Sequence, residues 1–271
     1  MMAQKRQSEE GTIEMSSSAS SSILSFAPPG IRRTLQRARA FFELKWAVAT
    51  HKTDPLLRRR FNHWAETGRT DSMERNHPHL AKAIIERMDI SPEDRILDVA
   101  CGSGWFCRLL ADVAGPKSQV RGLDISDSMI KLAKERSASY PNVSFHCGSS
   151  IDIPGPANFL TKIVSIEAFY YFDKQEQVMR NLLHATAPGG RVCILMCQFS
   201  ETAKSTEWIG DNGLPVHNLS AAQYEEMFKR AGWGKVRSEM IDFKKPEHGA
   251  LSAAALKDHD RAILVFGTKL A

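Results

Sequence analysis

The amino-acid sequence predicts an α/β protein built on a doubly wound, mostly parallel sheet, and two observations support this fold class. From about residue 90 onward, short apolar runs of strand length alternate with helical patterns, an order typical of a parallel sheet with helices on both faces. The strand runs are apolar throughout rather than alternating apolar and polar, as expected of strands buried on both faces. The 271 residues suffice for one domain of ordinary size with an appendage.

The predicted elements follow one another in a regular order. Strands are expected at 95–100, 120–125, 143–147, 162–167, 191–197, 235–243 and 261–269. Helices are expected at 55–66, from Pro78 onward, at 104–114, 127–139 and 221–231, and after residue 173. Asp173 with Glu176, and Ser220 with Gln223, match the capping-box spacing and are predicted to begin two of these helices. Gly232 fits the C-terminal end of the last helix.

The N-terminal region differs in composition from the rest. Residues 1–30 are polar and Ser-rich, so they are predicted to be a disordered extension. Residues 31–89 are predicted to form a basic amphipathic helix and further helices, and residues 90–271 the α/β domain. We favour a helix that packs on this domain. The alternatives are peripheral membrane contact through residues 31–60 and an organellar presequence.

The net charge of +5 is concentrated at the N-terminus. Residues 1–60 contain 11 Lys and Arg against 5 Asp and Glu, whereas the remaining 211 residues contain 25 against 26. A protein that binds nucleic acid usually has a basic patch on its working domain. The near-neutral domain therefore argues against a nucleic-acid partner.

The five cysteines are odd in number and form no C-x-x-C pair. This usage favours a reducing, cytoplasmic compartment in which thiols serve as small apolar residues. No zinc-ligand spacing is visible, so no metal is expected. No run of 18 or more apolar residues exists, so no segment is expected to span a membrane.

The strongest motif is the run Ile96–Trp105, in which a buried strand leads through a glycine turn into a helix. Gly102 and Gly104 allow the backbone to approach a ligand closely and to adopt positive φ. Ligands of open α/β sheets bind beyond the carboxyl ends of the strands, so a nucleotide site is expected here. A dinucleotide fingerprint would need a third glycine at Cys107, and a phosphate-binding loop would need Gly-Lys-Ser/Thr. Asp98, inside the strand, suits a cationic amino-acid moiety better than a pyrophosphate.

Leu97–Trp105 resembles the first motif of class I S-adenosylmethionine-dependent methyltransferases of the ubiquinone and menaquinone biosynthesis type. Gly122–Ser126 resembles the second motif, and Pro188-Gly189-Gly190 resembles the turn before strand five. The resemblance covers most of residues 90–270. It implies a Rossmann-like sheet of about seven strands with the last strand antiparallel, N-terminal lid helices, and S-adenosyl-L-methionine as cofactor.

The resemblance also implies cofactor-binding residues. Asp98 matches the acid near the methionine end, and Asp124 the acid that binds both ribose hydroxyls, to which a carboxylate's two oxygens are suited. The full set is Asp98, Ala100, Gly102, Gly104, Asp124, Ile125, Met129, Ser149, Ser150, Ile151 and Glu167. The sequence departs from the family pattern at Ser149, where an Asp usually receives the adenine amino group. It departs also at Ala100, where Gly is commoner, and at Thr161, where Asp often opens strand four.

The methyl acceptor is expected at the end of the fourth strand, which faces the reactive methyl group in this family. Glu167, Tyr170 and His217 are the candidate catalytic residues. Glu167 either acts on the acceptor or forms a structural contact. The tyrosines of Phe169–Phe172 either line a pocket or belong to the core. Trp64, Arg69 and Met73 of the lid, and the insertion at 208–218, are expected to cover the site.

The leading hypothesis is methyl transfer to a small-molecule acceptor by in-line displacement. A protein or RNA methyltransferase of the same fold is the second hypothesis. The third is a module that binds the cofactor without catalysis, which the serine at position 149 keeps open. The sequence does not predict the oligomeric state.

Overall fold

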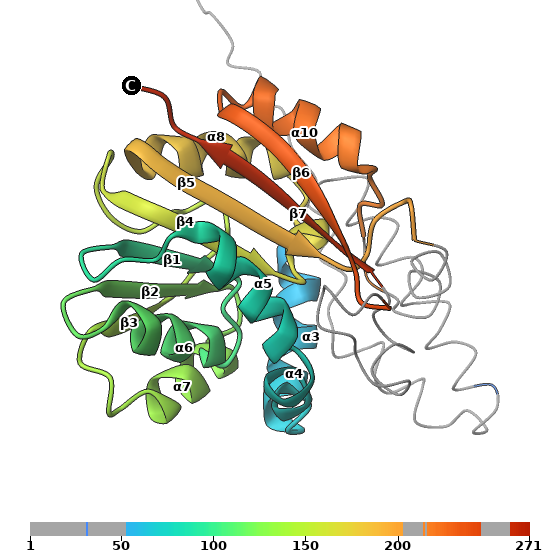
Figure 1. The fold of residues 1–271 in the computed structure, drawn as a ribbon. Helices are drawn as coiled ribbons and strands as arrows, with labels where there is room; N and C mark the ends of the chain where they lie inside the picture. The colour runs from blue at the N-terminus through green and yellow to red at the C-terminus, as the bar shows by residue number, and fades with distance from the viewer. Residues whose placement is uncertain (1–30, 32–52, 203–213, 215, 245–260) are drawn as a thin grey trace, which may run out of the picture. The chain divides into compact units, whose positions relative to one another are not determined.

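The computed structural model describes residue 31 and residues 53–202, 214, 216–244 and 261–271. Its centre is a seven-stranded sheet in the order β3-β2-β1-β4-β5-β7-β6 (Figure 1). The strand bounds are β1 Arg95–Val99, β2 Gln119–Asp124, β3 Val143–Cys147, β4 Leu160–Ile166, β5 Thr186–Met196, β6 Gly234–Asp242 and β7 Arg261–Thr268. β1 to β5 pair in parallel, whereas β7 is antiparallel to both β5 and β6. The predicted doubly wound sheet with an antiparallel last strand is confirmed.

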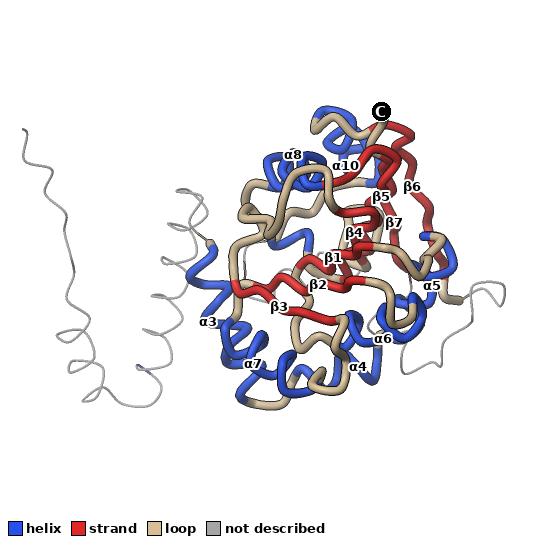
Figure 2. The backbone as a smooth tube through the Cα atoms, turned by 90° about the vertical axis from the view of Figure 1, so that its left-hand side faces the viewer, coloured by secondary structure: helices blue, strands red, loops and turns tan. Residues whose placement is uncertain are grey.

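Helices cover both faces of the sheet (Figure 2). Their bounds are α3 Asp54–Glu66, α4 Thr70–Asn76, α5 Pro78–Met88, α6 Trp105–Ala114, α7 Asp127–Arg136, the short 3-10 helix η1 Phe169–Tyr171, α8 Gln175–Ala185 and α10 Ala221–Arg230. One buried cluster joins α5, α6 and α7 to the sheet. A second joins η1, α8 and α10 to the opposite face. Burial of these apolar side chains is the main term that stabilises the domain.

Alternate residues of β1 face the two layers. Ile96 packs in the cluster with α5 and α6, and Leu97 and Val99 pack in the other cluster. Asp98 lies on the same face as Ile96, because side chains alternate along a strand. The sequence therefore places a buried carboxylate between the sheet and α6, directly before the glycine turn.

The two outer strands differ from the prediction that every strand is apolar throughout. In β3, Ser144 and His146 are exposed, and β6 alternates exposed and partly buried residues over most of its length. Both strands lie at the edges of the sheet. The inner strands β4, β5 and β7 are mostly buried.

One of the two predicted helix caps is confirmed and the other is wrong. The Ser220 side chain accepts from Gln223 N–H while the Gln223 side chain accepts from Ser220 N–H. Asp173 caps no helix: α8 begins at Gln175 without a side-chain cap. The Asp173 carboxylate instead accepts the Thr53 N–H at 2.9 Å. The spacing of Asp173 and Glu176 predicted a cap because a local pattern contains no information on the distant Thr53 N–H, which directly precedes α3.

The Pro188-Gly189-Gly190 segment also differs from its predicted role. The structure includes it within β5, which starts at Thr186, and the pairing with β4 shifts register between Leu160 and Lys162. Glycine in a strand is typical of such an irregularity. The motif therefore forms a bulged first half of the strand rather than a turn before it.

Several predictions concern residues outside the described part of the chain. These are the disordered extension at 1–30, most of the amphipathic helix and possible membrane contact at 31–60, and most of the insertion at 208–218. Within the described residues, no helix combines the length and apolar character needed to cross a membrane.

Gly104 should matter for folding and Gly102 much less. Both adopt positive φ, but a Cβ at Gly104 would lie 2.7 Å from the Phe145 ring, whereas a Cβ at Gly102 would meet no atom within 4 Å. Gly104→Ala should lower the free energy of unfolding by about 2–5 kcal/mol, the sum of positive-φ strain and overpacking. Gly102→Ala should show only the strain, about 1–2 kcal/mol. Denaturant titration of the two variants without ligand measures both losses of unfolding free energy. Equal losses would contradict the role of Gly104 in packing against Phe145.

Candidate functional site

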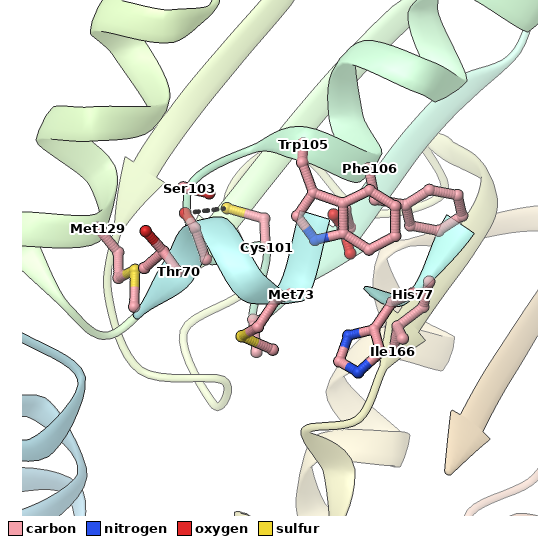
Figure 3. Close-up of a pocket in the computed structure, with 12 residues that line it drawn as sticks. Thr70, Met73, His77, Cys101, Ser103, Trp105, Phe106, Met129 and Ile166 are labelled. Atoms are coloured by element: carbon pink, nitrogen blue, oxygen red, sulfur yellow. Dashed lines mark hydrogen bonds between the residues drawn. The ribbon is translucent and has the colours of Figure 1, made fainter. Parts of the chain in front are cut away.

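A cavity lies at the carboxyl end of β1, between the glycine turn and α4. Figure 3 shows Thr70 and Met73 of α4, with His77 directly after this helix, on one side and Cys101, Trp105 and Phe106 on the other. The lining residues are Thr70, Met73, His77, Asp98, Ala100, Cys101, Gly102, Ser103, Trp105, Phe106, Met129 and Ile166. The structure thus brings Asp98, Ala100, Gly102 and Met129 of the predicted cofactor set to one cavity.

The backbone of the glycine turn is shaped for close approach. Gly102 has φ 53° and open space where a side chain would begin. Ala100 has φ 62°, a conformation that costs a residue with a Cβ about 1–2 kcal/mol. Glycine, which has no Cβ, would adopt this conformation without that cost. The turn keeps the conformation even with alanine because hydrogen bonds on both sides fix it, among them Cys101 N–H to Leu123 O at 3.0 Å.

Asp98 is a buried carboxyl group that lines the cavity, and only 2% of its surface is exposed. The Cys107 thiol donates to its Oδ2 at 3.4 Å. Burial raises the Asp98 pKa to about 8, and the nearby Asp124 adds to the rise. Burial also raises the pKa of the Cys101 thiol to about 11, so the thiols stay protonated. A cation in the cavity would favour ionised Asp98.

Asp124 connects the end of β2 to the glycine turn. Its Oδ2 accepts the Gly102 N–H at 2.8 Å, and its Oδ1 accepts the Ser126 N–H at 2.9 Å. Burial raises the Asp124 pKa, and these backbone hydrogen bonds oppose the rise. Asp124 is not the cap of α7, because Ser126 fills that position and its hydroxyl accepts the Met129 N–H. The backbone of Ile125 also donates to this carboxylate. A carboxylate has about four acceptor positions, so the three backbone donors leave capacity for a hydroxyl group.

The segment after β3 has serine where an acid was expected, and a carboxylate from α3 lies beside it. Ser149 donates its hydroxyl hydrogen to Asp54 Oδ2 of α3 at 2.7 Å. Ile151 packs against the core, and its carbonyl accepts from Asn181. Ser150 and Ile125 are partly buried at the same edge of the sheet. Gly148 N–H donates to Asp124 O at 2.9 Å, which fixes this segment beside the end of β2.

The predicted lid is present as α3 and α4, with a different division of roles. Met73 lines the cavity as predicted, together with Thr70. Arg69 is exposed and lies over the Trp64 ring, 4.2 Å from its centroid, and neither residue lines the cavity. Arg108 binds Glu74 at 2.9 Å, and Arg136 binds Asp71 at 2.7 Å. Ion pairs from α6 and α7 therefore hold α4 over the cavity.

The three candidate catalytic residues are linked. Glu167 is 7% exposed, and its Oε1 accepts the Cys197 N–H while its Oε2 accepts the Tyr170 hydroxyl at 3.3 Å. Glu167 has φ 55°, a strained conformation for a residue with a side chain. The His217 N–H donates to Tyr170 O at 2.8 Å. Glu167 directly follows Ile166, which lines the cavity.

The aromatic residues that follow β4 have different surroundings: Phe169 packs in the core, and Tyr170 contacts the candidate catalytic Glu167. Phe169 is fully buried and packs against Tyr224 and Phe228, so it belongs to the core. Tyr171 contacts Phe61 of α3 edge to face, with ring centroids 5.5 Å apart. Burial, and then the Glu167 charge, raise the Tyr170 pKa well above its ordinary value. Its hydroxyl is therefore a donor at neutral pH.

Sequence reasoning missed several residues that the structure brings to the site. Asn62 donates to Asp127 Oδ1, and its side-chain oxygen accepts from the Ser126 hydroxyl. His77 and Phe106 line the cavity, and Asp54 binds Ser149. Asp54 and Asn62 lie on a helix remote in sequence from the motifs, so no local pattern marked them. Among the described residues, no group of His, Cys, Asp or Glu is arranged to hold a metal ion.

Comparisons with known proteins agree with this geometry. The sequence pattern of a family described as a methyltransferase domain matches residues 90–232, more than half of the chain. The methyltransferase GfsG of Streptomyces halstedii is 27% identical over 137 residues, which cover 49% of each chain. This chain thus spans about half the length of GfsG. The demethylmenaquinone methyltransferase of Listeria monocytogenes is 24% identical, over 59% of this chain and 78% of its own.

Two solved structures show the same fold. A Haloferax volcanii protein, described as a methyltransferase in complex with the Trm112 methyltransferase activator, has a TM-score of 0.67 and 26% identity. The match covers 78% of this chain and 98% of that one. The Haemonchus contortus phosphoethanolamine N-methyltransferase 2, in complex with S-adenosylhomocysteine, has a TM-score of 0.58 and 18% identity, over 71% and 53% of the two chains.

The fold and the matched family pattern therefore identify a methyltransferase domain of the Rossmann-like class. The chain belongs to the family described as the methyltransferase domain. Two of the solved structures with this fold contain S-adenosylhomocysteine or S-adenosyl-L-methionine.

Asp98 should make the stability of the ligand-free protein depend on pH. Its pKa is about 8 in the folded protein and near 3.8 in the unfolded chain. Between these values the folded protein retains the proton that the unfolded chain releases, so the free energy of unfolding should fall as the pH rises from about 4 to about 8. Asp98→Asn should remove this part of the pH dependence.

Denaturant titrations at several pH values within this window measure the effect. Asp152→Asn is the matched control, because Asp152 is exposed and should leave the pH profile unchanged. Parallel profiles for the wild type and Asp98→Asn would show that Asp98 does not carry the effect.

Asp124 should give the protein a preference for a ribose with both hydroxyls. Hydrogen bonds to a charged acceptor are worth about 1.5–3 kcal/mol, so losing one should weaken binding by about 10-fold to 100-fold. We expect the wild type to bind S-adenosylhomocysteine that much more tightly than its 2′-deoxy analogue, and Asp124→Asn to discriminate less. Calorimetry with both ligands gives the ratio of the two dissociation constants for each variant. This ratio does not change with the stability that a variant loses when Gly102 and Ser126 lose an acceptor. An unchanged ratio would exclude the ribose role.

Proposed function

We propose that this protein transfers a methyl group to a small-molecule acceptor that binds beyond the carboxyl ends of β4 and β5. The observation that carries the proposal is the buried Glu167 carboxylate, oriented by the Cys197 N–H and the Tyr170 hydroxyl. This group directly follows a residue that lines the cavity. A fixed carboxylate beside the cofactor cavity can take a proton from an acceptor or bind a cationic one.

The residues present fit the cofactor. Gly102 leaves open space for a ligand, and the buried Asp98 provides a carboxyl group suited to a positively charged methionine moiety. Asp124 offers acceptors for the ribose hydroxyls. Bound S-adenosylmethionine supplies an electrophilic methyl group on a sulfonium. The protein's contribution is to orient the acceptor and to exclude water, which α4 supports by covering the cavity.

Glu167 is placed to act as a base or a charge partner because its geometry is fixed from several sides. The Cys197 N–H donates to one oxygen of the carboxylate and the Tyr170 hydroxyl donates to the other, so the carboxylate is held in one orientation. The high Tyr170 pKa keeps its hydroxyl a donor, so Tyr170 positions Glu167 rather than taking the proton itself. His217 joins this arrangement through its backbone N–H to Tyr170 O, and its imidazole is a second candidate base.

Two features support a small acceptor. The domain is near neutral, with 25 Lys and Arg against 26 Asp and Glu outside residues 1–60, and polymer-binding enzymes usually have a basic patch. The relatives also include proteins named for small acceptors, demethylmenaquinone and phosphoethanolamine. We further propose a reducing compartment such as the cytoplasm, because the five cysteines form no disulfide and four of them are buried.

A protein or RNA acceptor is the second candidate. The observation that favours it is the similarity to the Haloferax volcanii protein, which is seen with the Trm112 methyltransferase activator. The fold alone does not decide the reaction, since the [4+2]-cyclase SpnF also matches, with a TM-score of 0.57 and 20% identity over 71% of this chain and 80% of that one. The acceptor must therefore be tested directly.

Glu167→Gln should lower methyl transfer by about 10²-fold to 10⁴-fold, the usual contribution of a general base, while S-adenosylhomocysteine affinity changes little. The assay follows transfer of labelled methyl from S-adenosylmethionine to a panel of amines, phenols and quinols, and to protein and RNA in parallel. Glu226→Gln is the control, because Glu226 is exposed on α10. Labelling of protein or RNA alone would favour the second candidate. Full activity of Glu167→Gln would exclude Glu167 as the base.

A further inference from the structure

The segment after β3 lacks a carboxylate of its own, and α3 brings one to it. The sequence there is Gly148-Ser149-Ser150. Ser149 donates its hydroxyl hydrogen to Asp54 Oδ2 at 2.7 Å, across 95 residues of sequence. The carboxylate of Asp54 therefore lies directly beside Ser149.

The position of this carboxylate does not depend on Ser149 alone. The residue before it, Thr53, donates its N–H to Asp173. Leu57, one turn further along α3, is 4% exposed and packs in the core. Near the other end of the helix, Asn62 binds Asp127 and Ser126 of the β2–α7 connection. Since α3 is anchored at three places, it presents Asp54 at a fixed point.

Asp54 retains acceptor capacity for a further donor. The Ser149 hydroxyl binds Oδ2. Within the described part of the chain, no Lys, Arg or His lies within ion-pair distance of Asp54, and Oδ1 has no donor. A half-buried carboxylate in the first turn of a helix gains some stabilisation from the helix dipole. Stabilisation by the helix dipole would not require a serine hydroxyl opposite Asp54.

The sheet order fixes what lies beside Asp54. β3 is the neighbour of β2, and Gly148 N–H donates to the carbonyl of Asp124. A nucleoside whose ribose binds Asp124, and whose methionine end lies over the turn after β1, must extend its base in the opposite direction, toward β3. The base therefore meets the segment that contains Ser149, with the Asp54 carboxylate behind it.

We propose that Asp54 accepts a hydrogen bond from the exocyclic amino group of the cofactor's adenine, so that α3 determines base specificity. This inference rests on the proposed placement of the ribose at Asp124. Adenine presents an amino donor on this edge, which suits a carboxylate. Hypoxanthine presents a carbonyl oxygen there, and a carboxylate would repel it.

The test compares S-adenosylhomocysteine with S-inosylhomocysteine, in which the amino group is replaced by a carbonyl. The wild type should prefer the adenine ligand by at least about 10-fold, as expected for one hydrogen bond to a charged acceptor. Asp54→Asn should bring the ratio close to one, because an amide can donate as well as accept. Calorimetry gives both dissociation constants on the same protein sample, so a change in stability does not alter their ratio.

Two further variants distinguish recognition from helix anchoring. Asp152→Asn makes the same change of charge three residues after Ser149, at an exposed position, and should keep the wild-type ratio. The exchange Asp54→Ser with Ser149→Asp returns the acid to the segment after β3 and should restore the adenine preference. A wild-type ratio in Asp54→Asn would overturn the proposal. Failure of the wild type to bind S-adenosylhomocysteine would instead overturn the cofactor site itself.

Discussion

The hydrogen bonds of the Asp124 carboxylate are the constraint on which the site depends. One oxygen accepts from Gly102 after β1, and the other accepts from Ser126 at the start of α7. Two strands and two helices are thus joined at one buried point, where an unpaired N–H would cost about 1–3 kcal/mol. The cavity, the open face of Gly102 and the position of Met129 all follow from this junction. Asp124, which the sequence motif predicts to bind the ligand, therefore also holds the glycine turn and the start of α7 together.

The two acids of the site have different environments. Asp124 is compensated by backbone donors, whereas the donor to Asp98 among the described residues is the weak one of the Cys107 thiol. A buried carboxyl without such compensation is stable mainly in its neutral form, which lowers the stability of the ligand-free protein near neutral pH. A cationic ligand favours the charged form. The burial of Asp98 therefore links the binding of a positively charged group to the loss of the Asp98 proton.

The sequence predicted those features whose causes are local. The apolar runs predicted all seven strands to within a few residues except for the start of β5, and the spacing of Ser220 and Gln223 predicted a real cap. Features that depend on contacts between distant segments were missed. Asp173 has the spacing of a cap, yet it binds Thr53. Likewise, the sequence has Ser149 at a position where an acid was expected. The Asp54 carboxylate that lies beside Ser149 comes from a distant segment, so the sequence pattern could not predict it.

The N-terminal helices complete the site rather than only cover it. α3 contributes Asp54 to Ser149 and Asn62 to the β2–α7 connection, and α4 contributes Thr70 and Met73 to the cavity. Arg108 and Arg136, which fix α4, belong to the same helices that begin at the glycine turn and at Ser126. The matched family pattern begins only at residue 90, so these contacts from residues 54–76 are where specificity within a common fold can arise.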